Sequence, residues 1–564
     1  MIRRATTTTA NVFDEYIGPT NAKCVAAIDF GTSGTGYAYA FPGSDGIKDA
    51  RTALFSNGPW ADGKDGKTKT ALLLDENNKI MAFGKVAQKK YQSIAMKYKS
   101  DIAKYQAMVM KGNASSSKPE IKERYFECFK MNLYKTSVSG KMLISAANGV
   151  KIAAQTVFSE SLKYIKKTLL AQIDQSTNGI SERDIKWVLT VPAIWSDAAK
   201  QVMREAAELA GLKGVALQLA LEPEAASLWA LQSNDLSMDP DSKYMICDCG
   251  GGTIDVTVHE VDYSQRKVKE AFAYKLVIPA DGGDWGSTTI DQRVLQLLEE
   301  IFGKNRYLNM TEDPLGFLKI KEDIEMAKIT FDEDTDIVLV VPDSLTAKTH
   351  GDTTTAAEAM ERFCEKKNAE FFLIGQNLMI PADYFYENCM KPTITQTVTH
   401  VRNIVKNNTG ISKIILVGNF ANCRQLQKQF IQEFRYIEVK VPTPPGAVLF
   451  GADPGLVTQR KSRFTYGHRI SAVFDEAVHD EYKSFRSKAG RKYCQDIFAK
   501  FVLMGENLEV GKEVTRTYQT VEKRQSTMDF IIYKAPRRDV KYITDTLVEQ
   551  IGSFSLECSG REDR

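Results

Sequence analysis

The sequence predicts an α/β protein made of two similar halves that face each other across a cleft, followed by a small β-rich region. Three observations support this fold class. The chain has 564 residues, which is too many for one hydrophobic core. A hairpin pattern with a glycine-containing turn occurs twice, far apart in the chain. After about residue 460 the pattern changes to short alternating runs typical of strands.

The stretch CDCGGGTID, residues 247–255, is predicted to be the turn of a β-hairpin. Its glycines leave backbone N–H groups uncovered, and such amides form a concave site for phosphate. Strand alternation places Cys247 and Cys249 on the face opposite Asp248. No second pair of metal ligands is visible nearby, so we interpret both cysteines as buried apolar residues.

The stretch CVAAIDFGTSGTGYAYAF, residues 24–41, repeats this design. Each copy has an aspartate, then a glycine and a threonine: Asp29, Gly31 and Thr32 in the first, Asp248, Gly250 and Thr253 in the second. Two such hairpins would hold phosphates from opposite sides of the cleft. Their aspartates would hold hydrated magnesium, which prefers oxygen ligands and keeps its waters.

Composition limits the other function classes. The net charge of +3 is too small to indicate nucleic acid or a membrane surface as partner. No apolar run approaches the ~20 residues of a membrane-spanning helix, and residues 1–22 are expected to be a disordered tail rather than a signal. The odd count of nine cysteines indicates reduced thiols and a cytoplasmic location. The five histidines show no metal-ligand spacing, which argues against zinc.

The helix signals fit this plan. After Pro192, an apolar helical face is expected to end at Gly211, and it consists of Val202, Met203, Ala206, Leu209 and Ala210. A second helix is expected over residues 315–331, and its apolar face consists of Phe317, Ile320, Ile324, Ala327 and Phe331. Residues 104–120 are expected to be an insertion with a flexible polar loop.

In their order, these motifs resemble the actin-like ATPase domain of the 70-kDa heat shock protein family over roughly residues 23–455. The matching segments are residues 29–33 and 248–256 (phosphate loops), 191–212 and 221–231 (connecting segment), 416–421 (adenosine loop) and 444–452 (closing turn). The resemblance implies two duplicated ribonuclease-H-like α/β halves around a nucleotide cleft, with ATP or ADP and Mg²⁺ as cofactors. The phenylalanine of LVGNFA, the FKM segment and the short β-type C-terminal region resemble the divergent class-12 branch.

The resemblance also implies roles for individual residues. Asp29 and Asp248 would hold the metal through water, and Asp248 would thereby also serve catalysis. The phosphates would contact the backbone amides of Gly31, Thr32, Ser33, Gly250, Gly251, Gly252 and Thr253. The attacking water would be positioned by Lys130, Glu222, Asp255 and the Thr253 hydroxyl. Two alternatives stay open: Glu222 as an ordinary helix-start acid, and Lys130 as a surface lysine.

The adenosine site is carried over with departures. Glu325 and Lys328 have the spacing that would bind the ribose hydroxyls, against the alternative of a solvated charged face. The residue after Lys328 is Ile329, where the family has an arginine that stacks on adenine. In the adenosine loop, Gly418 is followed by Asn419 in place of a glycine and Phe420 in place of a serine. Phe420 would either stack on the base or belong to the core.

Residues 460–564 are expected to form a short β-rich domain, placed like the family's peptide-binding β-sandwich. The junction GADPGLVTQRKSRFTYG lacks the leucine-rich acidic linker of these chaperones. The chain ends before the sheet would be complete and no helical lid follows, so we expect a minimal or truncated β domain.

The sequence thus predicts a magnesium-dependent, slow ATPase whose cleft closes on ATP, with protein clients or partners reached through the β domain. The alternative is a nucleotide-gated scaffold that hydrolyses little, which Ile329, Asn419 and the missing linker favour. A small-molecule kinase is less favoured, because no sugar-type signature is present. Nucleic acid and a membrane span are not expected.

Overall fold

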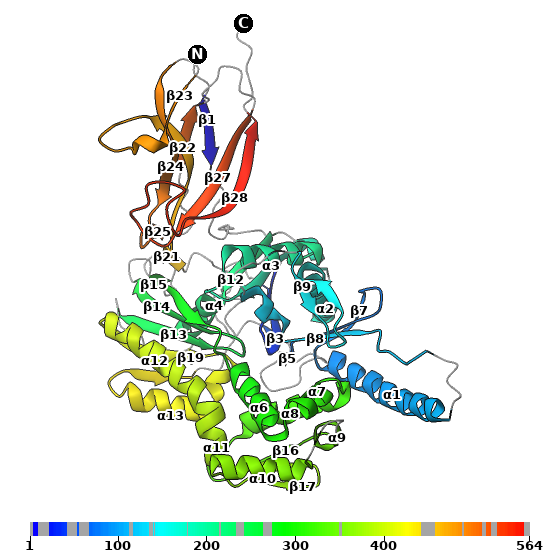
Figure 1. The fold of residues 1–564 in the computed structure, drawn as a ribbon. Coiled ribbons are helices and arrows are strands. Elements are labelled where there is room, and N and C mark those ends of the chain that lie inside the picture. The colour runs from blue at the N-terminus through cyan, green and yellow to red at the C-terminus, as the bar shows by residue number, and fades with distance from the viewer. Residues whose placement is uncertain are drawn as a thin grey trace.

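The computed structural model describes most of the chain. The described residues are 4–8, 22–41, 54–55, 67–111, 117–134, 139, 141–176, 179–213, 216–232, 242–262, 273–348, 352, 354–441, 457–487, 490–509, 515–519 and 527–557. The expected closing turn, residues 444–452, lies outside them. The molecule is a mixed α/β structure with several sheets (Figure 1).

The first predicted hairpin belongs to a six-stranded sheet. Its order is β12-β11-β2-β3-β4, and β5 also pairs with β3. The bounds are β2 (Cys24–Phe30), β3 (Gly34–Ala40), β4 (Leu54–Phe55), β5 (Lys67–Lys69), β11 (Ile185–Val191) and β12 (Ala216–Leu221). Helices α2 (Ala154–Ser176) and α3 (Asp197–Leu209) share a hydrophobic core with this sheet.

The second predicted hairpin belongs to a seven-stranded sheet in the order β20-β19-β13-β14-β15-β21-β25. The bounds are β13 (Lys243–Cys249), β14 (Ile254–Asp262), β15 (Ala273–Gly283), β19 (Ile411–Val417), β20 (Glu438–Lys440), β21 (Val457–Lys461) and β25 (Asn507–Glu509). Asp248 lies directly opposite Asp255 in the antiparallel pair. Cys247 and Cys249 are fully buried with their sulfurs 3.6 Å apart, which confirms their interpretation as core residues.

Helices cover this second sheet and extend below it in Figure 1. They are α6 (Thr288–Phe302), α7 (Lys304–Thr311), α8 (Pro314–Thr330), α9 (Asp343–Thr346), α10 (Ala356–Lys367), α11 (Ala382–Phe385), η5 (Tyr386–Met390), α12 (Lys391–Asn407), η6 (Asn419–Asn422) and α13 (Arg424–Glu433). A small sheet joins them, formed by β16 (Ile337–Val340), β18 (Asn377–Ile380) and β17 (Phe372–Ile374).

Smaller elements flank the first sheet. They are β6 (Ala71–Leu74), β7 (Ile80–Phe83), β8 (Arg124–Glu127), β9 (Leu143–Ser145), β10 (Lys151–Ala153), α1 (Gly84–Met110), η2 (Phe129–Tyr134), η3 (Glu182–Asp184) and α4 (Glu222–Gln232). The expected flexible insertion, residues 104–120, begins inside helix α1, and residues 112–116 lie outside the described residues.

A separate sheet stands at the upper end of the molecule in Figure 1, and its order is β23-β24-β22-β27-β28. The bounds are β22 (Thr465–Val473), η8 (Glu481–Lys483), β23 (Ser484–Arg486), β24 (Lys492–Val502), β27 (Thr527–Ala535) and β28 (Glu549–Glu557). Beside it, β1 (Arg4–Thr8) pairs with β26 (Thr515–Gln519). The expectation of a disordered tail is therefore wrong for these five N-terminal residues, because a C-terminal strand supplies their backbone partners; residues 9–21 are not described.

The predicted helices form with small corrections. Helix α3 ends before Gly211, whose φ of 79° suits glycine. Leu209, however, is 55% exposed and does not belong to the buried face. Helix α4 begins at Glu222, as the Glu-Pro pair predicts. In α8 the expected residues Ile320, Ile324 and Ala327 are buried. Among the described helices, none has the length and apolar character needed to cross a membrane.

Candidate functional site

The two glycine turns lie against each other. A Cβ atom added to Gly251 would collide with the Ser33 side chain. A Cβ atom added to Gly252 would collide with Thr32 and with Met131 of η2. The sequence predicted that the two hairpins approach from opposite sides, and the structure brings them into contact. Only glycine permits this approach, since any side chain would force the turns apart.

The carbonyl groups of the second turn are held by the segment before helix α6. Gly286 N, Ser287 N and Thr288 N donate to the carbonyl oxygens of Gly252, Gly250 and Gly251 at 3.1, 3.2 and 2.9 Å, respectively. The Gly250 amide donates to the Thr253 carbonyl at 2.9 Å. Of the amides predicted to contact phosphate, that of Gly250 is therefore already used inside the hairpin.

The first turn is held in a comparable way by Thr70. Its hydroxyl donates to the Gly31 carbonyl at 2.7 Å, and its backbone N–H donates to the Ser33 carbonyl at 2.9 Å. Sequence reasoning missed Thr70, because a threonine after a short strand carries no signal of its own. Both turns thus have carbonyl groups bound by a neighbouring segment.

Lys130 and Glu222 form an ion pair beside the turns, with Nζ 2.6 Å from Oε1. The side chain of Lys130 is only 3% exposed, and its Nζ lies 5.3 Å from the centre of the Trp195 ring. The structure therefore excludes the alternative of a surface lysine. Burial raises the pKa of Glu222 to about 7, reinforced by Asp29 and Asp255 and opposed by Lys130.

Asp29 has an unexpected partner. Lys67 Nζ on β5 lies 2.7 Å from Asp29 Oδ2, and the Thr190 hydroxyl donates to Asp29 Oδ1 at 2.9 Å. Burial acts to raise the pKa of Asp29, but the ammonium groups of Lys67 and Lys130 outweigh it, so this pKa is lowered. Lys67 could not be predicted from sequence, because its pairing with Asp29 depends on how β5 lies along β3.

Asp248 and Asp255 complete a group of four carboxylates. Burial, together with the charges of Glu222, Asp255 and Asp29, raises the pKa of Asp248 well above its usual value. Asp255 accepts a hydrogen bond from Ile194 N at 3.0 Å, yet burial still raises its pKa. The site thus contains the carboxylates of Asp29, Glu222, Asp248 and Asp255 but only the ammonium groups of Lys67 and Lys130, so it is short of positive charge.

These residues fit a hydrated divalent cation. A hard cation would neutralise the excess carboxylate charge, which adds to the effect of burial in raising the pKa of Asp248. Within the described ranges, no group of three or more His, Cys, Asp or Glu side chains is close enough to ligate one ion directly.

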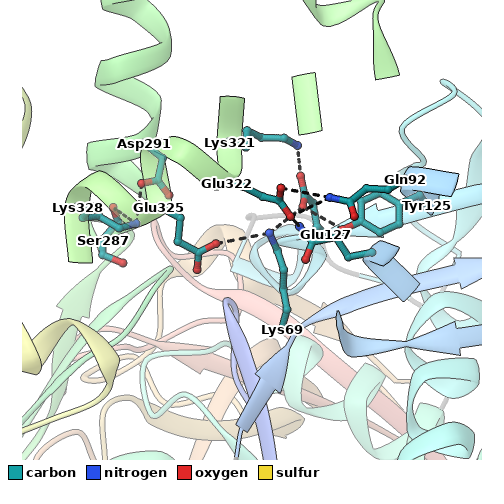
Figure 2. A network of polar contacts seen from close by, with 11 residues as sticks. Lys69, Gln92, Tyr125, Glu127, Ser287, Asp291, Lys321, Glu322, Glu325 and Lys328 are labelled. Atoms are coloured by element: carbon teal, nitrogen blue, oxygen red, sulfur yellow. Dashed lines mark hydrogen bonds and ion pairs between the residues drawn. The ribbon is translucent and has the colours of Figure 1, made fainter. Parts of the chain in front are cut away.

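Glu325 and Lys328 of α8 lie in a polar network that also includes residues of β5, α1 and β8 (Figure 2). Glu325 pairs with Lys69 at 3.6 Å, and Lys328 pairs with Asp291 at 2.6 Å. In the same network, Lys321 contacts Glu127, and Glu322 accepts from Gln88 and Gln92 at 2.6 and 3.0 Å. The face is therefore not a simply solvated one, whereas Ile329 is 68% exposed.

The predicted adenosine loop lies next to the second turn. A Cβ atom on Gly418 would collide with the Asp248 side chain and the Cys249 carbonyl, and φ at Gly418 is 87°. Asn419 Nδ2 lies 3.6 Å from the position of a Cβ on Gly34, so this loop also reaches the first hairpin. Phe420 is 4% exposed and packs in the hydrophobic core that includes β13, β14 and β19. The structure therefore supports a core role for Phe420 rather than stacking on the base.

Comparison with known proteins agrees with this geometry. A family model described as Hsp70 protein matches residues 100–371. Heat shock 70 kDa protein 12A of Mus musculus is 28% identical over an alignment that covers 95% of this chain and 85% of that protein. Heat shock 70 kDa protein 12B of Homo sapiens is also 28% identical, with coverage of 94% and 83%. Chaperone protein DnaK of Stenotrophomonas maltophilia is 26% identical over 56% of this chain and 44% of its own length.

The paired turns and the Hsp70 match define a protein with the actin-like ATPase fold, for which ATP binding is the expected property. More narrowly, the similarity to heat shock 70 kDa proteins 12A and 12B over nearly the whole chain supports the divergent class-12 branch of the 70-kDa heat shock protein family. The resemblance read from the sequence is confirmed at this level.

Proposed function

We propose that this protein binds ATP with Mg²⁺ and hydrolyses it slowly, and that hydrolysis drives opening and closing of the cleft. The contact between the two glycine turns, with Lys130 and Glu222 beside it, carries this proposal. Two duplicated ribonuclease-H-like halves over residues 23–455 would form the cleft, followed by the β domain of residues 460–564.

The phosphates would contact the amides of both turns. Magnesium would supply charge neutralisation for the phosphate oxygens and orient them. Asp29 and Asp248 would hold its waters, consistent with the raised pKa of Asp248 in a site short of positive charge. The Gly250 amide would stabilise the hairpin rather than bind phosphate, because it already donates to Thr253.

The attacking water would lie among Lys130, Glu222 and Asp255. Lys130 would stabilise charge that develops on the phosphoryl group. Glu222 would accept the proton of the water, since a pKa of about 7 suits proton transfer near neutral pH. The Thr253 hydroxyl, which hydrogen-bonds Asp255, would keep that carboxylate in place.

The nucleoside would lie between the network of Figure 2 and the adenosine loop. Glu325 and Lys328 would bind the ribose hydroxyls, while Gly418 and Asn419 would approach the base. Binding would require Glu325 and Lys328 to exchange part of their contacts with Lys69 and Asp291. Phe420 would support the loop from the core.

The alternative is a nucleotide-gated scaffold with little hydrolysis, and one observation favours it. The Lys67 ammonium lies 2.7 Å from Asp29, so it competes with a cation for that carboxylate. In either case the useful output would be a conformational change passed to the C-terminal sheet or to a protein partner. A chaperone role and a cytoplasmic location are part of this proposal.

Single-turnover hydrolysis with Mg²⁺ tests the proposal, with ATP binding measured in the same samples. The proteins are the wild type, Asp248→Asn and Lys130→Ala. Hydrolysis by the wild type alone, with ATP binding retained in Lys130→Ala, is the expected result. ATP binding without hydrolysis in all three proteins would leave the scaffold as the better description.

A further inference from the structure

A cavity of about 190 Å³ lies between the nucleotide-binding region and the C-terminal sheet. Its lining comes from the start of α3, from β15, from β21 and the residues after it, from β25 and from β27. Figure 1 shows β21 and β25 at this junction. The volume is below the ~300–1,000 Å³ typical of sites for drug-sized ligands, so it suits a small molecule.

Cations dominate the charge of this cavity. The cationic side chains among its described lining residues are Lys200, Arg460, Lys461, Arg463 and Lys534. Asp197 is the one carboxylate among those same residues. Arg460 forms an ion pair with Glu224, which is not a lining residue of the cavity. Lys534 forms an ion pair at 3.3 Å with Glu549, whose side chain is 68% exposed. Five cations therefore face three carboxylates even when these outer partners are counted.

The described contacts of the other cations are weak. Lys461 Nζ lies 3.5 Å from the Val277 carbonyl, and Arg463 Nη1 lies 3.5 Å from the Ala193 carbonyl. Arg463 also lies 5.7 Å from the centre of the Phe464 ring. Gathering cations in a partly buried space costs free energy, because each is partly desolvated and repels the others. A bound anion would offset both costs.

Helix α3 adds to this effect. It begins at Asp197, and its first residues line the cavity. The N-terminus of a helix carries partial positive charge, which the Asp197 carboxylate offsets in part. The helix and the cations together form a positively charged space with apolar walls, such as Leu508 and Phe464.

We propose that this cavity is a binding site for a small oxyanion with at least two negative charges, either a phosphate or a dicarboxylate. Lys200 belongs to the nucleotide-binding region and Lys534 to the C-terminal sheet, so the bound anion contacts both. The site is separate from the glycine turns and requires no hydrolysis of ATP.

The test is thermal denaturation of the full chain saturated with ADP and Mg²⁺, at constant ionic strength with chloride as the reference. Inorganic phosphate and succinate are titrated separately, and the dependence of Tm on concentration gives the Kd. The variants are Lys534→Gln and Arg463→Gln. Lys500→Gln is the matched control, because this exposed lysine belongs to β24 of the same sheet and does not line the cavity.

Stabilisation of the wild type by at least one anion, with binding about tenfold weaker in each cavity variant and unchanged in the control, is the expected result. The preferred anion distinguishes a phosphate ligand from a carboxylate. The proposal is overturned if neither anion stabilises the wild type beyond chloride. Equal binding by the wild type and both cavity variants would also overturn it, because the anion would then bind outside this cavity. Because the measurement is made in ADP and reads Tm, an absence of ATP hydrolysis at the glycine turns does not affect this outcome.

Discussion

Arg460 and Glu224 form a buried ion pair with two hydrogen bonds. Arg460 Nε and Nη2 donate to the two carboxylate oxygens of Glu224 at 2.9 and 2.6 Å. The Glu224 side chain is fully buried and that of Arg460 is 14% exposed. Glu224 follows Glu222 by two residues in the first turn of α4, while Arg460 belongs to β21. The pair thus joins the helix that carries a catalytic candidate to the strand that leads into the C-terminal sheet.

Removing one partner of this pair should destabilise the protein strongly. Arg460→Met leaves the Glu224 carboxylate buried without its cation, at a cost of about 3–5 kcal/mol. The double variant Glu224→Leu/Arg460→Met should recover most of this loss, because no uncompensated charge remains. Urea unfolding of both variants measures the difference. Equal destabilisation in the single and double variants would mean that packing, rather than charge, sets the cost.

The stability of the nucleotide-free protein should depend on pH through Glu222. Its pKa of about 7 lies above its ordinary value of 4.5. The folded protein therefore keeps a proton that the unfolded chain has released between these values. The contribution of this group is full below about pH 4.5 and is lost as the pH rises through about 7.

Glu222→Gln removes the contribution of this carboxyl group to the pH dependence of stability. The stability of the wild type relative to the variant should fall by up to about 3 kcal/mol between pH 5 and pH 8. Burial lowers the pKa of His259 to about 3, which gives the opposite dependence on pH in both proteins and cancels in the comparison. Unfolding curves recorded without metal provide the test. Parallel pH profiles would show that Glu222 titrates normally.

Methyl groups on the second turn should separate the two hairpins. Gly251→Ala places a Cβ against Ser33, and Gly252→Ala places one against Thr32 and Met131. Each should cost about 1–3 kcal/mol of stability and weaken ATP binding. Gly552→Ala is the control, since a Cβ there would meet no atom within 4 Å. Isothermal titration with ATP measures the effect, and wild-type affinity in both turn variants would contradict the close approach.

Lys67 should compete with magnesium. Lys67→Met removes the ammonium that lies 2.7 Å from Asp29. The Mg²⁺ concentration for half-maximal nucleotide binding should then fall by about tenfold, because Asp29 no longer has an internal counter-ion. Lys500→Met is the control, since this exposed lysine lies on β24 of the C-terminal sheet. This role would be rejected if the half-maximal Mg²⁺ concentration fell in the control as well. It would also be rejected if that concentration were unchanged in Lys67→Met.

Sequence reasoning was strongest where backbone geometry demands particular residues. Glycine turns, alternating strands and the Glu-Pro helix start are local signals, so both hairpins and the start of α4 could be predicted. Contacts between distant segments were harder. Lys67 reaches Asp29 only because β5 lies in the sheet of β2, and Arg460 reaches Glu224 only because β21 lies near helix α4. Phe420 could not be assigned from sequence, because a core ring and a stacking ring have the same chemistry.

The edge of the second sheet has a consequence for biosynthesis. Strand β15 pairs with β21, and β21 pairs with β25, so residues that include Glu509 complete a sheet whose central hairpin begins at Lys243. A ribosome delivers these strands long after the hairpin has emerged. The edge of β15 must therefore wait, unpaired and prone to association with other chains, until β21 has been synthesised. The chain would need protection from such association at this stage of its synthesis.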